Sequence, residues 1–167
     1  SPVLAGPGAC GAFLLLEDGI PLRPAGFCNV NNLFEMNLAQ ASGVEVLRGP
    51  GSALYGGTAL LGAVNVRSAA PAAELAGPEG MIQAELGPLS YGGLQGRVAA
   101  PLGGERVLAT FDVVDTDGWQ DDTGFRHRKG SVRAQGDWGP WRHDFQLSGA
   151  SLDQNTGGFV VGPEAFA

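Results

Sequence analysis

The stretch VEVLRGPGSALYG, residues 44–56, followed by GAVNV at residues 62–66, decides the interpretation of this chain. Residues 44–47 are mostly apolar and β-branched, which predicts a strand. The glycines and the proline that follow end this strand, because proline has no backbone N–H and glycine allows positive φ. Residues 52–55 predict one helical turn, and residues 63–66 predict a second strand.

Two kinds of active site do not fit this glycine-rich stretch. A phosphate-binding loop needs the pattern GxxxxGK[ST], and the only lysine of the chain is the distant Lys129. A nucleophile elbow needs a glycine two residues after the serine, where Leu54 follows Ser52. His127 and His143 lie far downstream and belong to no recognisable Ser/His/acid set. We therefore predict that the protein is not an enzyme and has no catalytic residues.

The remainder of the first region predicts a compact mixture of short strands and helix. Residues 13–16 predict a buried strand that ends at the turn signal of residues 17–19. Residues 20–26 contain two prolines and a glycine and predict a loop. Asn32 followed by Glu35 resembles a capping box and predicts a short helix that ends before Gly43. We expect an α+β domain over residues 1–70 and a linker over residues 71–80.

From residue 81 onward the hydrophobic period becomes two and stays so. This pattern predicts five antiparallel strands, joined by turns at residues 88–90, 101–105, 119–125 and 139–140. One face of these strands is apolar and the other is repeatedly charged or amidic. The apolar positions are Ile82, Ala84, Leu86, Leu94, Gly96, Val98, Ala100, Val107, Ala109, Phe111, Val113, Gly130, Val132, Ala134, Gly136, Phe145, Leu147 and Gly149.

Two architectures share this alternation. A transmembrane β-barrel turns its apolar face to lipid and its polar face to a wet interior, whereas a soluble sandwich turns the apolar face inward. Trp138 and Trp141 flank one tight turn on the apolar side, where an aromatic girdle at a membrane boundary would lie. A hairpin tip packed on a soluble core explains them equally well. Periodicity alone leaves both architectures open.

Residues 44–56 and 62–66 resemble the signature that closes the plug domain of TonB-dependent outer-membrane receptors. Upstream, residues 15–22 (LLEDGIPL) are similar to a strand-and-turn motif of the same family. The two motifs occur in the family's order and at its usual separation, and the alternating strands begin where the family's barrel begins. The resemblance covers essentially the whole chain.

This resemblance implies a fold and a function. The fold is the second half of a plug, followed over residues 81–167 by the first five strands of a barrel of about 22 strands. A barrel made of these strands alone would be incomplete. The function is binding and energised uptake of a scarce nutrient, such as a siderophore-iron complex or cobalamin, across the bacterial outer membrane. The segment that contacts the TonB inner-membrane complex is expected to precede Ser1, in sequence that this chain lacks.

The resemblance also implies roles for particular residues. Glu45 and Arg48 match the charged pair that docks the plug against acidic groups of the barrel wall. The segment of residues 23–32 matches the outer apex of the plug and offers polar and aromatic groups to a ligand, namely Arg23, Phe27, Asn29, Asn31 and Asn32. Asparagines chosen for their turn conformations would explain the same segment. Cys10 and Cys28 are the only cysteines, and we expect a disulfide that staples this segment, although two unrelated thiols remain an alternative.

The amino-acid composition limits the kinds of partner that the protein can bind. The formal net charge is -7, with 10 basic and 17 acidic residues, so the chain lacks the basic surface that nucleic-acid binding requires. Neither the cysteines nor the histidines have metal-site spacing, and we expect no metal and no cofactor. The expected partners are outer-membrane lipid, a small-molecule or metal-chelate ligand, and TonB. The competing hypothesis is a secreted soluble β-domain that acts as an adhesin or carbohydrate-binding module.

Overall fold

The computed structural model describes residues 13–22, 36–55, 59, 61–119 and 123–155. The chain divides into two compact units, Ser1–Ala73 and Glu74–Ala167, and each is described by itself. In the part of the chain that the structure describes, no helix has the length and hydrophobicity that a membrane span requires.

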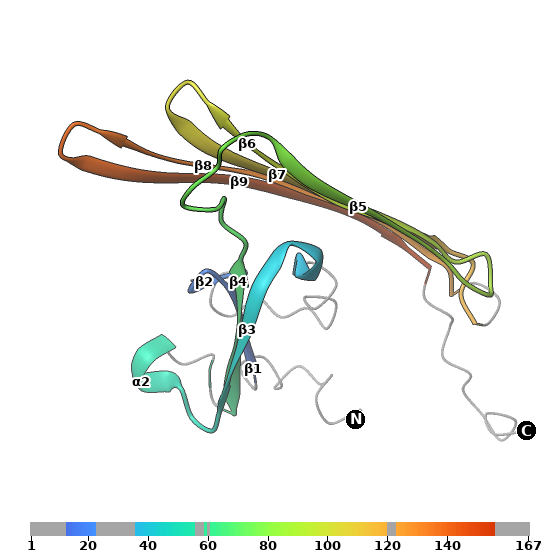
Figure 1. The fold of residues 1–167 in the computed structure, drawn as a ribbon. Helices are drawn as coiled ribbons and strands as arrows, with labels where there is room; N and C mark the ends of the chain where they lie inside the picture. The colour runs from blue at the N-terminus through green and yellow to red at the C-terminus, as the bar shows by residue number, and fades with distance from the viewer. Residues whose placement is uncertain (1–12, 23–35, 56–58, 60, 120–122, 156–167) are drawn as a thin grey trace, which may run out of the picture. The chain divides into compact units, whose positions relative to one another are not determined.

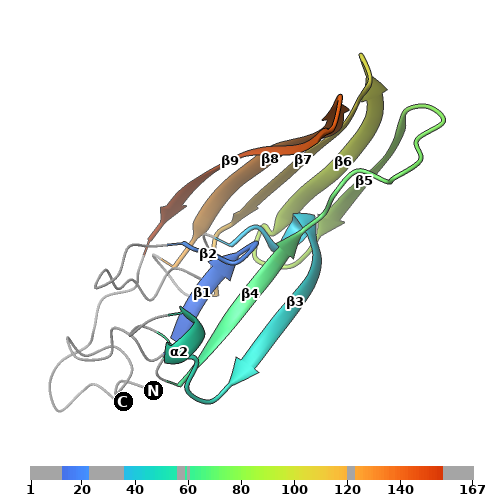
Figure 2. The ribbon, with the colours of Figure 1, turned by 90° about the vertical axis from the view of Figure 1, so that its left-hand side faces the viewer.

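The first unit is built on a four-stranded sheet with the order β2-β1-β4-β3. Strands β1 and β4 run parallel, and the two outer pairs are antiparallel. Figure 2 shows β1, β4 and β3 side by side, with the short helix α2 near one end. The elements are β1 (Phe13–Glu17), β2 (Ile20–Pro21), the 3-10 turn η2 (Leu38–Gln40), β3 (Ala41–Arg48), α2 (Ser52–Tyr55) and β4 (Gly62–Ser68).

One face of this sheet contains the small core of the unit. Leu14 and Leu16 alternate along β1 and are buried together with Ala59 and Ala63, and Tyr55 of α2 packs against them. Because side chains alternate between the faces of a strand, two leucines separated by one residue reach the same core. The motif of residues 44–66 thus contributes to the core through α2 and β4.

A tight hairpin and a buried polar network close one end of the sheet. Asp18 and Gly19 both have positive φ (50° and 80°), which fits the two-residue turn between β1 and β2. The Asp18 carboxylate accepts a hydrogen bond from the Ser68 backbone N–H at 2.9 Å. The buried Gln40 amide donates to Glu17 Oε1 at 3.1 Å. Because buried polar groups must find partners, this network fixes η2 against the ends of β1 and β4.

The sequence prediction was wrong in two details of this unit. The helix expected from Asn32 to before Gly43 is a 3-10 turn at Leu38–Gln40 in its described part, and Ala41 already pairs with Ser68. Pairing with β4 overrides the local helix signal there. Within the expected loop, Ile20–Pro21 forms a short strand, which proline tolerates because β2 is an edge strand. The strands expected at residues 13–16, 44–47 and 63–66 and the helical turn at residues 52–55 are confirmed.

The second unit is one five-stranded antiparallel sheet with the order β5-β6-β7-β8-β9. Figure 1 shows it as a single long, curved layer. Every strand pairs with its neighbour in sequence, as the five predicted alternating segments required. Its strands are β5 (Glu79–Leu86), β6 (Gly92–Leu102), β7 (Glu105–Thr116), β8 (Phe125–Trp138) and β9 (Trp141–Gln154).

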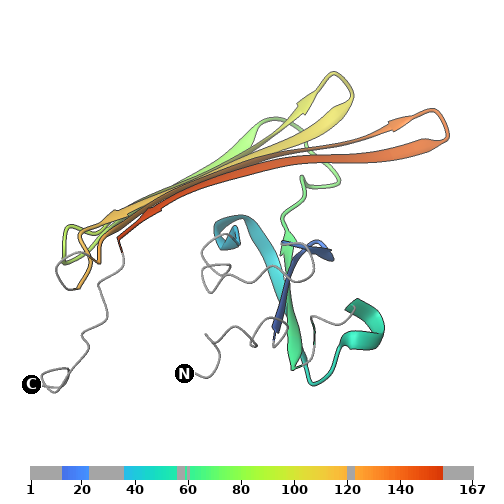
Figure 3. The same ribbon diagram turned by 180° about the vertical axis from the view of Figure 1, so that it is seen from behind.

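Short and long connections lie at opposite ends of this sheet. The β6–β7 and β8–β9 turns have two residues each, Gly103-Gly104 and Gly139-Pro140. The other two connections, residues 87–91 and 117–124, are longer and lie at the far end, as Figure 3 shows from behind. The turn expected at residues 101–105 is shorter than predicted, because Pro101 and Leu102 pair with Arg106 and Glu105 and extend the hairpin.

Candidate functional site

The apolar face of the β5–β9 sheet is exposed. Five large side chains, one from each strand, have between 39% and 74% of their surface accessible: Ile82, Val98, Phe111, Val132 and Leu147. In a soluble sandwich these residues would converge on a shared dry interior. The described residues instead leave them uncovered, and this excludes a sandwich core formed by this face within the described structure.

Charged residues lie at both ends of the apolar face. On β7, the apolar residues Val107 to Val113 lie between Glu105 and Asp115 on the same face. At about 3.3 Å per residue and a tilt of about 35–45°, the ten residues from Glu105 to Asp115 span a height of about 25 Å. A barrel that crosses a bilayer has an apolar band of about that height. We call this surface the apolar belt.

The opposite face of the same sheet is a network of polar side chains. Arg133 forms a two-pronged ion pair with Asp144, with N–O distances of 2.9 and 2.6 Å. His127 Nε2 lies 2.6 Å from Asp112 Oδ2, and the hydroxyls of Thr110 and Ser131 are 2.8 Å apart. Such a face suits water or a polar partner, whereas the apolar belt suits neither.

An ionisable tyrosine lies in the connection between β5 and β6, outside the strands. Partial burial, followed by the nearby Glu85 carboxylate, raises the pKa of the Tyr91 phenol. The phenol therefore stays protonated at neutral pH and can donate to Glu85, from which it lies 3.5 Å away.

Trp138 and Trp141 lie at the short-turn end of the apolar belt. They face each other across the β8–β9 pair, and 69% and 74% of their surfaces are exposed. Their place at the edge of the belt is compatible with the predicted interfacial girdle. That role stays a prediction.

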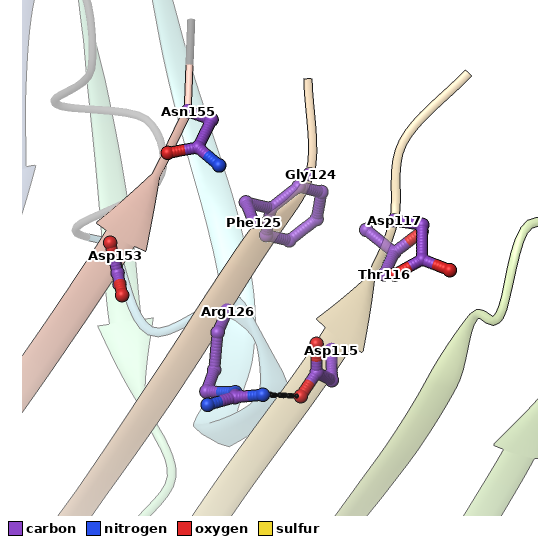
Figure 4. Close-up of a pocket in the computed structure, with 8 residues that line it drawn as sticks. All are labelled: Asp115, Thr116, Asp117, Gly124, Phe125, Arg126, Asp153 and Asn155. Carbon is purple, nitrogen blue, oxygen red and sulfur yellow. Dashed lines mark hydrogen bonds and ion pairs between the residues drawn. The ribbon is translucent and has the colours of Figure 1, made fainter. Parts of the chain in front are cut away.

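A cavity of about 370 Å³ lies at the opposite end of the sheet, where β7, β8 and β9 approach the longer connections. Figure 4 shows Asp115, Arg126 and Asp153 on three neighbouring strands, with the Asp115 carboxylate paired to the Arg126 guanidinium at 2.5 Å. The remaining lining residues are Thr116, Asp117, Gly124, Phe125 and Asn155. Among the described residues, no group of three or more histidines, cysteines and carboxylates is arranged to hold a metal ion.

Glu45 belongs to a polar cluster on the first unit. Its carboxylate lies 3.3 Å from Arg67 Nε and accepts a hydrogen bond from the Asn65 amide at 3.1 Å. Asn65 Oδ1 in turn accepts from the Gly19 backbone N–H at 2.9 Å. The cluster therefore connects β3 and β4 to the β1–β2 turn on an exposed surface.

The structure does not bring Glu45 and Arg48 together. Strand alternation places them on opposite faces of β3, and Arg48 is exposed at the end of the strand opposite Gly62. Asn65 and Arg67 were missed as partners of Glu45. The sequence contains a usable signal, since antiparallel pairing of residues 44–47 with residues 63–66 puts Asn65 directly opposite Glu45.

Several predicted site residues lie outside the described residues. They are the two cysteines, Cys10 and Cys28, and the members of the apical segment, Arg23, Phe27, Asn29, Asn31 and Asn32. Their roles remain those that the sequence suggested.

Comparison with protein families identifies the first unit. Residues 4–63 match the model of the TonB-dependent Receptor Plug Domain. The chain therefore contains a plug domain of the TonB-dependent receptor type. The match includes the motif of residues 44–56 and most of the sheet β1–β4, which is the region where the sequence resemblance was strongest. It is a match to a receptor domain, in agreement with the prediction that the chain is not an enzyme.

Solved TonB-dependent receptors share the fold of this chain over both units. The pyoverdine outer membrane receptor FpvA from Pseudomonas aeruginosa, bound to pyoverdine, is 19% identical with a TM-score of 0.62, and the match covers 83% of this chain and 20% of that one. The ferric yersiniabactin uptake receptor FyuA from Yersinia pestis is 23% identical with a TM-score of 0.62, with coverages of 84% and 23%. The siderophore receptor PirA from Pseudomonas aeruginosa is 23% identical with a TM-score of 0.58, with coverages of 86% and 27%.

The chain spans about a fifth to a quarter of the length of these receptors. The predicted fold class, a plug domain followed by open antiparallel strands of a receptor barrel, is confirmed. FpvA, which shares this fold, is described as an outer membrane receptor.

Proposed function

We propose that this chain contributes the plug and the first barrel strands to an outer-membrane receptor that binds and imports a scarce nutrient. The observation that carries the proposal is that a plug domain is followed along the chain by a sheet with one apolar and one charged face. A plug-domain match over residues 4–63 is followed by a sheet that is apolar and exposed on one face and charged on the other. A soluble adhesin or carbohydrate-binding domain gives no reason for an exposed apolar belt about 25 Å tall.

The connections suggest an orientation for the sheet. Outer-membrane barrels have short turns on the periplasmic side and longer loops outside. The two-residue turns beside Glu105 and Trp138 therefore lie at the periplasmic boundary. The connections of residues 87–91 and 117–124, together with the cavity next to Asp115, lie at the extracellular end.

The cargo class is proposed from the relatives. The solved receptors that share this fold are described as receptors of pyoverdine, ferric yersiniabactin or another siderophore. A ferric siderophore is therefore the first candidate, and cobalamin is the second. We further propose that uptake is energised through the TonB complex.

The experiment compares uptake by cells that express the full-length gene with uptake by cells that lack it. The probes are ⁵⁵Fe loaded on a hydroxamate, a catecholate and a mixed-type siderophore, and radiolabelled cobalamin. Expression should increase accumulation of one iron probe, and removal of TonB should abolish the increase. Equal accumulation of all probes with and without the gene would contradict the proposal.

The apical segment can be tested within the same assay. Arg23→Ala and Phe27→Ala should weaken binding of the transported probe by about tenfold each, because each removes a charged or aromatic contact. Reduction with dithiothreitol should weaken it further if Cys10 and Cys28 are bridged, since the bridge would pre-order the segment. Unchanged binding in both variants would place the ligand elsewhere.

Arg48 is proposed to dock the plug against carboxylates of the barrel wall, and Glu45, three residues earlier on the opposite face of β3, is proposed to take part from its own side. The proposal is supported by the exposure of Arg48, which forms no ion pair with any residue that the structure describes. Arg48→Gln should lower uptake by at least about tenfold, because it leaves buried wall acids without a partner.

Arg67→Gln provides the matched control for this prediction. It removes an arginine from the neighbouring strand β4, at the other end of the β3–β4 pair, and breaks the exposed ion pair with Glu45. Exposed ion pairs contribute little to stability, so uptake should stay within about twofold of the unmodified protein. Equal losses in Arg48→Gln and Arg67→Gln would contradict a docking role for Arg48.

A further inference from the structure

A carboxylate and an imidazole interrupt the apolar belt at its short-turn end. Glu105 Oε2 lies 2.6 Å from His143 Nε2, and the Trp138 indole N–H donates to Glu105 Oε1 at 3.3 Å. The Trp138 and His143 rings are 4.3 Å apart. All three residues lie on the same face as Val107, Val132 and Leu147, so the cluster is part of the membrane-facing surface.

The backbone at Gly136 makes this cluster possible. Gly136 lies opposite His143 on the strand between Glu105 and His143. A Cβ at this position would collide with the Glu105 carboxylate. With no side chain on Gly136, Glu105 reaches across β8 and bonds with the imidazole of β9. The position of the carboxylate is thus fixed by the sheet and by two hydrogen bonds.

The two hydrogen bonds use only part of the acceptor capacity of the Glu105 carboxylate. His143 Nδ1 is buried without a hydrogen-bond partner, whereas Nε2 faces Glu105. A proton on Nδ1 would be unsatisfied, so the geometry fits the tautomer with its proton on Nε2 alone. Its Nε2–H donates to one oxygen of Glu105 and leaves the other lone pairs of the carboxylate available as acceptors. The ion pair between Arg142 and Asp137, at 3.6 Å, belongs to the opposite face of the strands and does not compensate Glu105.

We propose that Glu105, Trp138 and Trp141 bind the primary ammonium of an aminophospholipid headgroup, such as phosphatidylethanolamine, in the periplasmic leaflet. Two of the carboxylate's lone-pair positions are occupied by His143 and Trp138, and the others can accept from an ammonium. The exposed indoles of Trp138 and Trp141 offer π-faces to the same cation. The inference rests on the proposed function, because it requires the apolar belt to face lipid.

The charge of the cluster selects among headgroups. A carboxylate attracts an ammonium and repels the anionic headgroup of phosphatidylglycerol, which has no cation. The other end of β7 is a useful contrast, because its carboxylate, Asp115, is already paired with Arg126 at 2.5 Å. We therefore expect a preference for the amino headgroup at the Glu105 end that Asp115 does not share.

The experiment presents both lipids to the full-length receptor. The protein in detergent micelles is mixed with equal amounts of phosphatidylethanolamine and phosphatidylglycerol that have identical acyl chains, and retained lipids are counted by native mass spectrometry. The unmodified protein should retain the ethanolamine lipid in preference. Glu105→Gln keeps the size of the side chain but removes its charge, and should lower the ratio of the two lipids up to about fivefold, the effect of losing one exposed ion pair. Asp115→Asn, on the same strand and face, should leave the ratio unchanged.

Trp141→Leu gives a second variant that keeps the Glu105–His143 bond. Trp141→Leu should lower the ratio of ethanolamine to glycerol lipid by a smaller factor than Glu105→Gln. The Trp141 variant still tests the proposal if Glu105→Gln does not fold. A ratio of one in the unmodified protein, or a ratio unaffected by both variants, would overturn the headgroup proposal. Retention of neither lipid by a protein that stays monomeric without detergent would instead refute the membrane-facing sheet and, with it, the proposed function.

Discussion

Leu147→Arg should sharply reduce the amount of folded receptor in membranes, whereas Ser148→Arg should leave it nearly unchanged. Leu147 and Ser148 are neighbours on β9, both exposed and on opposite faces of the sheet. Leu147 pairs with Val132 in the middle of the apolar belt. An arginine on the lipid face near the bilayer centre costs about 2–4 kcal/mol, but on the lumen face it remains in a polar environment.

The measurement is folding of the full-length protein into lipid vesicles, followed by heat-modifiable electrophoretic mobility and denaturant titration. The expected cost corresponds to a shift of the folding equilibrium by about 30- to 900-fold. Equal tolerance of both arginines would show that the two faces have the same environment. A protein that stays folded and monomeric without detergent would also contradict this orientation, because a soluble sandwich would bury Leu147 without lipid.

Much of the fold could be predicted because the hydrophobic period of a strand and the turn residues that end it are both local features of the sequence. The five strands of the second unit follow from alternation such as that of Val107 to Val113, and each is bounded by glycine- or proline-containing turns. The strand, turn and helical turn of residues 44–55 follow for the same reason. Errors occurred where long-range pairing decides, as at Ala41, whose strand conformation comes from its partner Ser68.

The choice between barrel and sandwich could not be made from period alone. Both architectures alternate apolar and polar residues, and they differ only in what covers the apolar face. The structure contributes the missing observation, because Ile82 and Leu147 remain exposed at opposite edges of one open sheet. The positions of the charged residues are a second observation in favour of the barrel. Glu105 and Asp115 delimit an apolar band of the height that a bilayer requires.

The candidate sites were less predictable than the fold. Glu45 was selected through the motif, but its partner Arg67 depends on register and on a side chain that passes Gly43. The cluster of Glu105, Trp138 and His143 joins residues of three strands up to 38 positions apart in sequence. Only pairing across β7, β8 and β9, with an empty position at Gly136, brings them together.

The plug motif itself makes the second large prediction: Gly62→Ala should destabilise the β3–β4 pair by about 1–3 kcal/mol. A Cβ at Gly62 would lie 2.6 Å from the Leu47 carbonyl oxygen, which is a backbone atom of the paired strand and cannot move without breaking the ladder. Replacing glycine by alanine usually stabilises by about 0.4–1 kcal/mol through the unfolded chain. The collision is the larger effect, so the net change should be a loss.

Gly43→Ala is the matched control on the same strand pair, because the atom nearest to its Cβ is the end of the flexible Arg67 side chain at 3.3 Å. Hydrogen exchange of the full-length receptor measures both variants through peptides that cover β3 and β4. Exchange should accelerate about 5- to 150-fold in Gly62→Ala, the factor that corresponds to about 1–3 kcal/mol of lost protection. It should change little in Gly43→Ala. Similar acceleration in both variants would mean that the close approach of Leu47 does not limit residue 62, and that the glycine there is retained for another reason.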